Sequence, residues 1–412
     1  MKKTIFRLFS LLFVVLALTL SVFALDSGWD IPYSDDIDWR KYSEENITIN
    51  VYNWGEYMSV DTGDGSFDVN AEFEELTGIG VNYSNFASNE ELYAKLKSGG
   101  STYDIIIPSD YMVSRLIKEN LLEKLDYSNI PNFSKIMERY KNPEYDPTNE
   151  YSVPYMWGRI GIIYNTTMVD EEDNVHSWNI LWNEKYANNI LMFSNSRDAF
   201  AITCARLGYS MNTTDEKELR AVAQALKEQK LLVQAYVMDE IYDKMGGGEA
   251  ALAPYYAGDA IVMMEDNPDL AFVVPDEGTN LFLDAMCIPK GARNKAAAEM
   301  YINFVTETLV ARENSIYIGY SVPQQESYDS LPDEIRDDKI RYPDPEDMLK
   351  DEIYIALPET TTKLIDSLWT GILSDVRSSP WMTPVMLILV IGLTIIINVR
   401  REIKKKNKIE NH

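Results

Sequence analysis

Residues 47–54 read ITINVYNW, and residues 55–57 directly after them read GEY. Apolar and polar residues alternate in the first stretch, which predicts a half-buried β-strand that ends at Trp54. A tryptophan that only fills a core would lie within the strand, and a solvated turn does not need two large aromatic residues. The end of this strand, with Trp54, Glu56 and Tyr57, is therefore a candidate binding surface.

Helices and strands alternate in the sequence that follows. The predicted elements are a helix at 68–78, a strand at 80–86, a helix at 88–100, a strand at 103–108 and a helix at 112–122. Asp68 is a suitable N-cap and Gly78 a suitable stop for the first helix, and SNEE at 88–91 is a capping box for the second. This order predicts a mostly parallel sheet that is covered by helices on both faces.

A second set of elements with the same character follows. The predicted strands lie at 158–165, 189–194, 250–257, 270–275 and 281–289, and the predicted helices lie at 197–207, 215–227 and 294–306. A chain of 412 residues is longer than one compact core usually accommodates. The sequence therefore predicts an α/β fold of two lobes, with more than one crossing of the chain between them.

Both ends of the chain carry membrane-directed signals. Basic residues at 2–7 precede an apolar run and a small-residue cleavage site, so residues 1–24 predict a secretory signal peptide, with an uncleaved anchor as the alternative. Residues 381–399 are apolar, uncharged and long enough to span a bilayer, and the basic residues at 400–412 predict a cytoplasmic tail. The remaining connecting segments are an acidic spacer at 25–47 and a short stalk at 371–380.

The composition excludes several classes of function. The net charge is −27 and both ends are basic, so the region between them is more acidic still, which argues against a nucleic-acid partner. His176 and His412 are the only histidines and G-x-S-x-G is absent, so we expect no zinc site and no Ser-His-Asp triad unless His176 serves in one. Cys204 and Cys287 lie in apolar stretches and are predicted to be buried free thiols, with one disulfide as the alternative. We expect no enzymatic activity, no cofactor and no metal site.

The residues near the ends of the predicted strands are mostly aromatic or acidic. Ligands of open α/β sheets bind beyond the carboxyl ends of the strands, which makes these residues the candidates for a site. They are Trp54, Glu56, Tyr57, Ser109, Tyr111, Asn195, Asp198, Tyr255, Tyr256, Phe282, Asp284 and Tyr320. Tyrosines at several strand ends predict an aromatic box that could hold an alkyl cation.

Asp284 is the most informative candidate. It lies within the apolar stretch LFLDAM at 281–286, where burial of an unpaired carboxylate would be costly. Its partner is either a basic group of a ligand or a group of the protein, through a cap or an ion pair with Lys290 or Arg293. Both interpretations, a ligand group and a protein group as the partner of Asp284, are consistent with the sequence.

Several stretches together resemble a known family. They are YNWGEYMS at 52–59, SNEELYAKLKSGGSTYDIIIPSDYMVSRL at 88–116, YSVPYMWGRIGIIYN at 151–165, LGYSMNTTD at 207–215, FLDAMCIP at 282–289 and YIGYSVP at 317–323. In this order they resemble the periplasmic spermidine/putrescine-binding proteins of polyamine ABC importers. The resemblance runs from about residue 48 to 368 and implies a two-lobed, type II-like periplasmic-binding-protein fold with the ligand in the cleft. It implies one lobe of residues 48–155 and 281–329 and another of residues 156–280 and 330–370.

The resemblance also implies roles for individual residues. Asp198 and Asp284 would bind ammonium groups, Tyr256 and Phe282 would cover methylene groups, Tyr320 would close the aromatic box, and Trp54, Tyr57, Ser109 and Tyr111 would line one wall. The chain departs from the family pattern at Asn195, where an aspartate is expected, at Gly55, where a hydroxyl residue is expected, and at Tyr354, where a glutamine is expected. The loss of one carboxylate weakens the case for a third ammonium, although Glu56 could supply another charge.

The reading that follows is a membrane-tethered, extracytoplasmic substrate-binding component of an ABC importer for putrescine, spermidine or both. Its partners would be the polyamine, a separately encoded permease and ATPase, and the membrane through the C-terminal helix, and we expect a monomer. One alternative is a protein of the same fold for another small solute. A site for an amino acid or an anion would need an arginine or a helix N-terminus that faces the cleft, and Arg197 is the one candidate. The other alternative is a cell-surface polyamine sensor, for which the tail at 400–412 is short.

Overall fold

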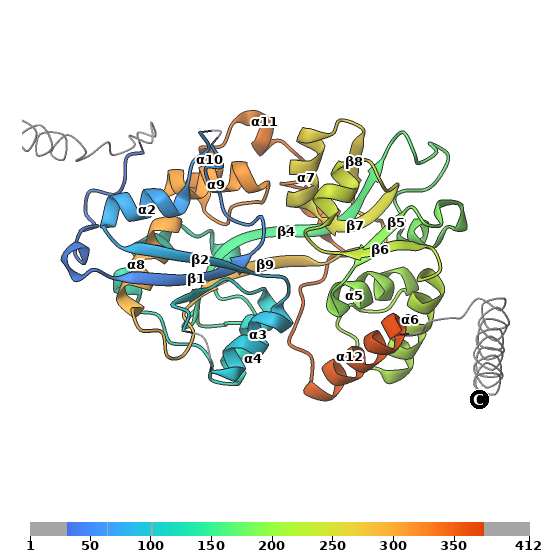
Figure 1. Cartoon of the computed structure of the whole chain (residues 1–412), viewed down its shortest axis with the longest axis horizontal. Helices are drawn as coiled ribbons and strands as arrows, with labels where there is room; N and C mark the ends of the chain where they lie inside the picture. The colour runs from blue at the N-terminus through green and yellow to red at the C-terminus, as the bar shows by residue number, and fades with distance from the viewer. Residues whose placement is uncertain (1–30, 64, 100–101, 375–412) are drawn as a thin grey trace, which may run out of the picture. The chain divides into compact units, whose positions relative to one another are not determined.

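A computed structural model of the chain describes residues 31–63, 65–99 and 102–374. The chain divides into two compact units, Met1–Ile365 and Asp366–His412. The first unit holds the sheet and the helices that cover it (Figure 1). Of the second unit, the described part is the C-terminal portion of helix α12 (Glu359–Ser374).

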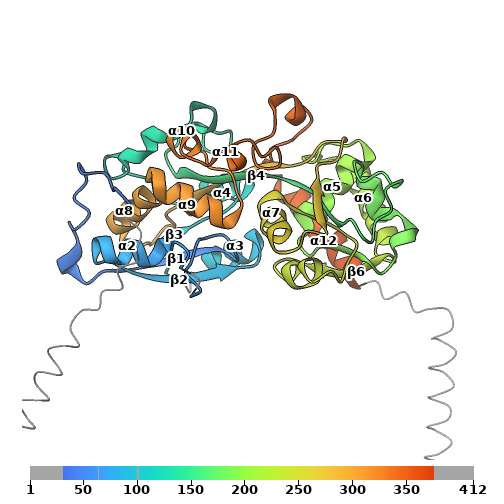
Figure 2. The same ribbon diagram turned by 90° about the horizontal axis from the view of Figure 1, so that it is seen from above.

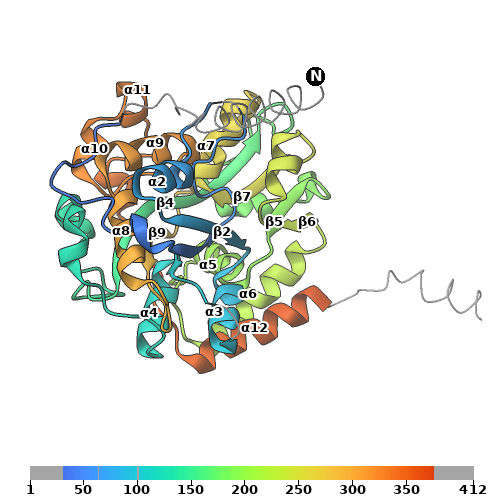
Figure 3. The same ribbon diagram turned by 60° about the vertical axis from the view of Figure 1, so that its left-hand side comes forward.

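The first part of the chain folds as alternating strands and helices, as the sequence predicts. The elements are β1 (Thr48–Trp54), α2 (Val69–Thr77), β2 (Gly80–Phe86), α3 (Asn89–Ser98), β3 (Ile105–Ile106) and α4 (Asp110–Lys118). Strand β1 lies between β2 and β3 and pairs with both in parallel. Helices α2 and α9 lie on one face of these strands and α3 and α4 on the other (Figures 1 and 3). The expected parallel sheet with two covered faces is therefore present in this part of the chain.

The middle and C-terminal parts supply the remaining elements of the first unit. The strands are β4 (Ser152–Asn165), β5 (Ile190–Phe193), β6 (Val233–Val237), β7 (Leu252–Tyr256), β8 (Leu270–Val273) and β9 (Leu281–Cys287). The α-helices are α5 (Ser196–Leu207), α6 (Glu216–Gln229), α7 (Ala257–Asp266), α8 (Lys295–Val305), α9 (Thr308–Ile318), α10 (Gln325–Asp329) and α11 (Asp333–Arg336). The short 3₁₀ and π turns are η1 (Ser43–Glu45), η2 (Tyr127–Asn129), η3 (Pro131–Lys135), η4 (Glu138–Tyr140), η5 (Trp178–Trp182), η6 (Glu184–Tyr186), η7 (Tyr242–Gly246) and η8 (Pro345–Met348).

Strand β4 joins the two halves of the sheet. The strand order is β2-β1-β3-β9-β4-β7-β5-β6, and β8 pairs with β4 on the edge opposite to β7. The first part of β4, up to Arg159, pairs antiparallel with β9, and the part from Ile160 onward pairs antiparallel with β7 and β8. Figure 2 shows β4 running between the β1–β3 half and the half that contains α5, α6 and α7. The central pairings are thus antiparallel, which the prediction of a mostly parallel sheet did not include.

The helix starts follow the predicted capping chemistry. The Asp68 side chain accepts a hydrogen bond from the amide of Ala71, and Gly78 ends the helix with a φ of 77°. At α3, the Ser88 hydroxyl accepts from the Glu91 amide at 3.1 Å. The Glu91 carboxylate accepts in return from Ala87, one residue before the cap, at 3.0 Å. These local bonds fix where each helix begins beside the strand end that precedes it.

Several predicted boundaries and segments differ from the structure. The helix predicted at 112–122 begins earlier, at Asp110, and ends at Lys118. Within the predicted spacer, Trp39 is buried and packs against Phe304 of α8, so the described part of that segment is attached to the lobe. Cys204 and Cys287 are buried free thiols, as predicted.

The predicted membrane-directed segments at 1–24 and 381–399, with the tail at 400–412, lie outside the described residues. Within the ranges that are described, none of the helices combines the length and apolar character needed to cross a bilayer.

Candidate ligand-binding site

The turn after β1 is held in place by the core on one side and lines a pocket on the other. Tyr155 donates a hydrogen bond to the carbonyl of Tyr57 at 2.7 Å, and the Asn53 side chain donates to the same carbonyl at 3.1 Å. These bonds fix the backbone of the turn. The Tyr57 side chain is only 4% exposed, yet neither its hydroxyl nor the indole N–H of Trp54 has a hydrogen-bond partner among the described residues. Two buried donors are therefore available to a bound molecule.

Asp284 lies in the middle of β9 and is 5% exposed. Burial raises the pKa of its carboxyl to about 7, although the neighbouring Ser109 and Tyr57 side chains favour the charged form. Its Oδ1 atom has no hydrogen-bond partner in the part of the chain that the structure describes. The ammonium group of Lys290, one of the two internal partners considered above, instead bonds Glu123 at 3.0 Å. The reading of Asp284 as half of an internal ion pair with Lys290 is therefore wrong.

Asp198 lies in the first turn of α5, and protein groups surround its carboxylate. The Tyr256 hydroxyl donates to Oδ2 at 2.5 Å, and the Tyr354 hydroxyl donates to Oδ1 at 3.0 Å. Asn195 is the N-cap of the helix, since its Oδ1 accepts from the Asp198 amide and its Nδ2 donates to Oδ2 at 2.8 Å. The positive end of the helix dipole also favours a negative charge at this position.

Asp259 occupies the equivalent position at the start of α7. The hydroxyls of Tyr242 and Tyr320 each donate to one of its oxygens at 2.7 Å. Burial raises the pKa of Asp259 to about 7, and the negative charges of Asp239 and Glu56 add to the shift. Gly258 permits this arrangement, because a Cβ atom there would lie 2.2 Å from the ring of Tyr320.

Asn89 connects the starts of α3 and α4 at another wall of the pocket. Its Oδ1 accepts from the amide of Ser109 at 3.2 Å, and its Nδ2 donates to the Tyr111 hydroxyl at 3.1 Å. That hydroxyl in turn donates to Glu90 at 3.1 Å. These bonds place the Glu90 carboxylate and the Tyr111 hydroxyl near Ser109, which follows β3.

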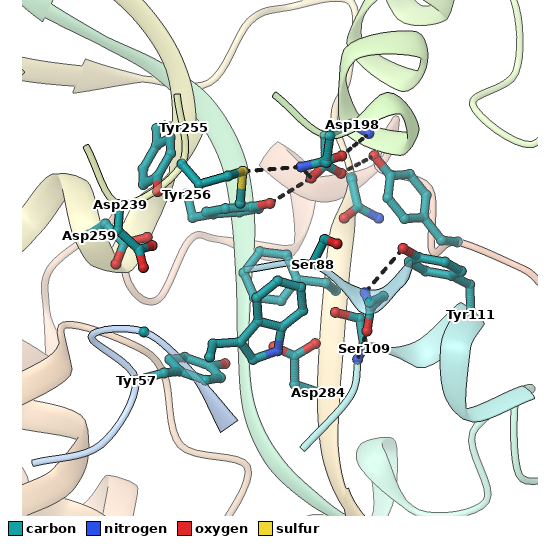
Figure 4. A pocket seen from close by; sticks show the side chains of 18 of the residues that line it. Tyr57, Ser88, Ser109, Tyr111, Asp198, Asp239, Tyr255, Tyr256, Asp259 and Asp284 are labelled. Atoms are coloured by element: carbon teal, nitrogen blue, oxygen red, sulfur yellow. Dashed lines mark hydrogen bonds between the residues drawn. The ribbon is translucent and has the colours of Figure 1, made fainter. Parts of the chain in front are cut away.

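These groups line one pocket, which contains about 720 Å³ of empty space that is partly open to solvent (Figure 4). Among the residues that the structure describes, five carboxylates and no lysine or arginine belong to the lining. The lining residues are Trp54, Gly55, Tyr57, Ser88, Asn89, Glu90, Ser109, Tyr111, Asn195, Asp198, Met238, Asp239, Tyr255, Tyr256, Asp259, Asn280, Phe282, Asp284, Tyr320 and Tyr354. Packed aromatic rings form much of the wall. Tyr57 with Tyr320 and Tyr256 with Phe282 are edge contacts, with centroid separations of 4.7 and 5.7 Å, and Phe282 and Tyr320 form a tilted pair at 6.0 Å.

The structure brings together all of the predicted site residues except Glu56. Glu56 adopts a left-handed φ of 48°, and its neighbours Gly55 and Tyr57 line the pocket while its own side chain does not. Asn195 does line the pocket, but its side chain is engaged in capping α5 and in bonding Asp198.

The sequence reasoning missed several lining residues. Asp239 follows β6, a short strand that was not predicted, and Met238 lies beside it. Ser88, Asn89 and Glu90 were read only as a helix start. The signal for Asp259 was present, because it follows the predicted strand that contains Tyr255 and Tyr256.

Two residues that the sequence suggested for other functions, Arg197 and His176, do not line the pocket. Arg197, the candidate for binding an anionic solute, donates to the carbonyl of Met211 and to the Asn212 side chain and lies 4.2 Å from the ring centroid of Tyr354. It does not line the pocket. His176, the candidate base of an enzyme, is also absent from the lining.

Comparison with known proteins agrees with this arrangement. Residues 100–351 match the family described as bacterial extracellular solute-binding protein. The chain belongs to that family. Among the relatives of this extracellular solute-binding protein is the spermidine/putrescine-binding periplasmic protein of Salmonella typhimurium. The two are 36% identical over 312 residues, which cover 76% of this chain and 87% of the relative.

Other relatives of this solute-binding protein carry related names. The putrescine-binding periplasmic protein SpuD of Pseudomonas aeruginosa is 28% identical over 347 residues, covering 80% of this chain and 93% of the relative. The solved structure of the spermidine/putrescine ABC transporter substrate-binding protein PotD from Streptococcus pneumoniae is 38% identical. It superimposes with a TM-score of 0.66, covering 79% of this chain and 98% of that one. The two-lobed α/β fold of periplasmic binding proteins is therefore established for this chain.

Proposed function

We propose that this protein is the extracytoplasmic substrate-binding component of an ABC importer and that it captures a polyamine, namely putrescine, spermidine or both. The observation that carries the proposal is the charge of the pocket, since its lining within the described part of the chain has five carboxylates and no lysine or arginine. A flexible organic cation complements such a site, because each ammonium can form charge-assisted hydrogen bonds with a carboxylate. The names of the relatives support the same ligand class.

Binding would use the two kinds of surface in the pocket. Asp284 and Asp198 would each accept hydrogen bonds from an ammonium group, and the free oxygen of Asp284 is available for this without breaking any protein bond. The ring faces of Trp54, Tyr256 and Phe282 would cover the methylene groups through apolar burial and cation–π attraction. Tyr57, Ser109, Tyr111, Tyr320 and Tyr354 would position these groups. No bond of the ligand is broken in this scheme, so it requires no nucleophile.

We place the ligand between two lobes, residues 48–155 with 281–329 and residues 156–280 with 330–370. Strand β4 changes its pairing partners near Arg159 and Ile160, which supports a lobe boundary close to residues 155 and 156. Asp284 and Ser109 belong to one lobe and Asp198 and Asp259 to the other. A ligand that bonds both sets would favour the closed state, as in other hinge-closing proteins.

We further propose that residues 381–399 tether the protein to the membrane, with the tail at 400–412 in the cytoplasm. The length, apolar character and basic flank of that stretch support this topology. A tether would keep the bound polyamine at a high effective concentration near the permease. Protease added to intact cells should degrade the lobes and spare an epitope on the tail, and loss of that epitope would contradict the topology.

Calorimetric titration of the full chain in detergent tests the ligand assignment. Putrescine and spermidine should give saturable heats and raise the melting temperature, as expected for any ligand that binds only the folded state. Butane-1,4-diol, which has the length of putrescine without its charges, and succinate, which has opposite charges, should do neither. Absence of a shift at millimolar polyamine would refute the assignment.

A further inference from the structure

Gly55 and Asp239 both line the pocket and lie next to each other, although they are far apart in the sequence. Gly55 lies in the turn after β1, and Asp239 follows β6. A Cβ atom on Gly55 would lie 2.1 Å from Oδ2 of Asp239 and 3.0 Å from its Cγ atom, both well inside contact distance. Gly55 does not have a positive φ, so its backbone does not require a glycine. Because glycine has no side chain, position 55 leaves space for the Asp239 carboxylate.

Asp239 occupies this space without a cationic partner. No hydrogen bond or ion pair involves its carboxylate among the described residues, and its charged neighbours are acidic. The Asp239 residue as a whole is exposed to solvent, and partial desolvation of its carboxyl group, together with the negative charges of Glu56 and Glu240, raises its pKa. Figure 4 shows the carboxyl groups of Asp239 and Asp259 close together, and the oxygens of Asp259 are already bonded to Tyr242 and Tyr320. Asp239 thus has a full set of free acceptors in a region of negative potential.

A second group in the same pocket also lacks a partner. The hydroxyl of Tyr57 is buried and makes no hydrogen bond of normal geometry with another described residue, although it lies near the Asp284 carboxylate. It is close enough to Asp259 and Asp284 for both carboxylates to influence its ionisation. The Tyr57 ring contacts that of Tyr320, which bonds Asp259. Unused acceptors and an unused hydroxyl therefore lie along the wall between the Asp259 end of the pocket and Asp284.

Asp239 lies in a different part of the pocket from Asp198 and Asp284. In Figure 4, Asp198 lies beside Tyr256 at one corner, Asp284 lies at a second, and Asp239 and Asp259 lie together at a third. A diamine that bonds Asp198 and Asp284 would leave the third corner without a cation. A triamine has one more ammonium to place there.

We propose that Asp239, admitted by the absent side chain of Gly55, binds the third ammonium of a triamine and makes the pocket selective for triamines over diamines. This inference rests on the proposed polyamine-binding function. It assigns Asp239 and Gly55 as specificity determinants of that site. Asp239 supplies the charge, and Gly55 leaves the space that the Asp239 carboxylate occupies.

The charge is tested by Asp239→Asn, which keeps the size of the side chain. The variant should lose about ten- to hundredfold in affinity for spermidine, the range expected for a hydrogen bond to a charged group. Its affinity for putrescine should change less than about twofold. Asp243→Asn is the matched control, because Asp243 is an exposed aspartate nearby that does not line the pocket. It should leave both affinities unchanged.

The space is tested by a double-mutant cycle. Gly55→Ala alone should weaken spermidine binding, because the added methyl group displaces the Asp239 carboxylate. Added to Asp239→Ala, the same change should cost little further, because the carboxylate it would displace is gone. Thermal melting of each ligand-free variant shows whether the fold is retained.

Two results would overturn this inference. One is an equal loss of spermidine and putrescine affinity in Asp239→Asn, and the other is no loss of either. Failure of the unmodified protein to bind any polyamine would instead refute the proposed function, so the two failures are distinguishable.

Discussion

The pocket holds its buried aspartates in two different ways. Asp198 and Asp259 each lie in the first turn of a helix that follows a strand, and each receives two tyrosine hydroxyls. Asp284 lies within a strand, and one of its oxygens has no partner. The helix-borne carboxylates are therefore already satisfied by the protein, whereas the strand-borne carboxylate has an oxygen that no described protein group satisfies. We expect the first pair to support both structure and binding and Asp284 to serve binding alone.

The largest expected effect is that of Asp284→Asn. The change is nearly isosteric and removes the charge, so it should cost about 2 to 5 kcal/mol of binding free energy. That corresponds to roughly 30-fold to several thousand-fold in affinity for spermidine. The ligand-free variant should melt no lower than the unmodified protein, because no internal cation is left unpaired and a costly buried charge is removed. Titration and thermal melting measure the two quantities.

Asp104→Asn is the contrasting control for that variant. Asp104 is also buried, but it accepts hydrogen bonds from the backbone of Asn50, Arg293 and Asn294 away from the pocket. Its variant should melt lower and bind normally. A normal affinity in Asp284→Asn would remove Asp284 from the site.

Acid should weaken binding and stabilise the empty protein. The pKa values of Asp284 and Asp259 are both raised to about 7, so protons compete with a cation below that pH. Affinity should fall from pH 8 to pH 5, by at most about tenfold per pH unit for each proton involved. Between about pH 4 and 7 the folded, ligand-free protein retains protons that the unfolded chain has released, so its stability falls as pH rises through about 7.

Titrations and melting curves at several pH values, with and without ligand, would measure these opposite trends. In Asp284→Asn both trends should be smaller, because one of the two titrating groups is gone. An affinity that stayed constant between pH 8 and pH 5 would contradict the role of both carboxyls in binding.

Asp198→Asn should reduce the stability of the empty protein, unlike Asp284→Asn. An amide nitrogen would replace one oxygen and meet the donors of Tyr256, Tyr354 and Asn195. A buried donor without an acceptor costs about 1 to 3 kcal/mol of unfolding free energy. Chemical denaturation without ligand measures the loss, and an unchanged midpoint would show that the network around Asp198 does not stabilise the fold.

The smallest expected effects concern two tyrosine hydroxyls. Tyr57→Phe removes a hydroxyl that has no partner, so the stability of the empty protein should change by less than about 0.5 kcal/mol while affinity falls a few-fold. Tyr354→Phe removes a donor to Asp198 and should cost the empty protein about 1 kcal/mol. Paired melting and titration curves compare them. Equal losses of stability would abolish the distinction between the two kinds of aspartate.

Much of the fold was predictable because it rests on local patterns. The strand at 47–54, the caps at Asp68 and Ser88 and the buried stretch around Asp284 all follow from residues close to one another in sequence. Site residues at strand ends could be named for the same reason, since parallel strands bring their carboxyl ends to one edge.

What could not be predicted depends on backbone geometry and on partners distant in sequence. The left-handed φ of Glu56 determines which residues of the turn line the pocket, and no pattern in the sequence indicates it. Asp239 follows a strand of only five residues, Val233–Val237, which begins shortly after the end of α6 and is only partly buried. The close approach of that residue to Gly55 can be seen only once both halves of the sheet are folded.

The pairing of strand β4 with both halves of the sheet has a consequence for how the protein unfolds. Its backbone amides and carbonyls take part in the ladders of both halves, so neither half can lose its sheet without exposing polar groups of the other. We therefore expect the part of the chain that contains the sheet to unfold in one cooperative transition, despite its two-lobed architecture. The amides of β4 should be among the slowest to exchange with deuterium, whether or not a polyamine is present.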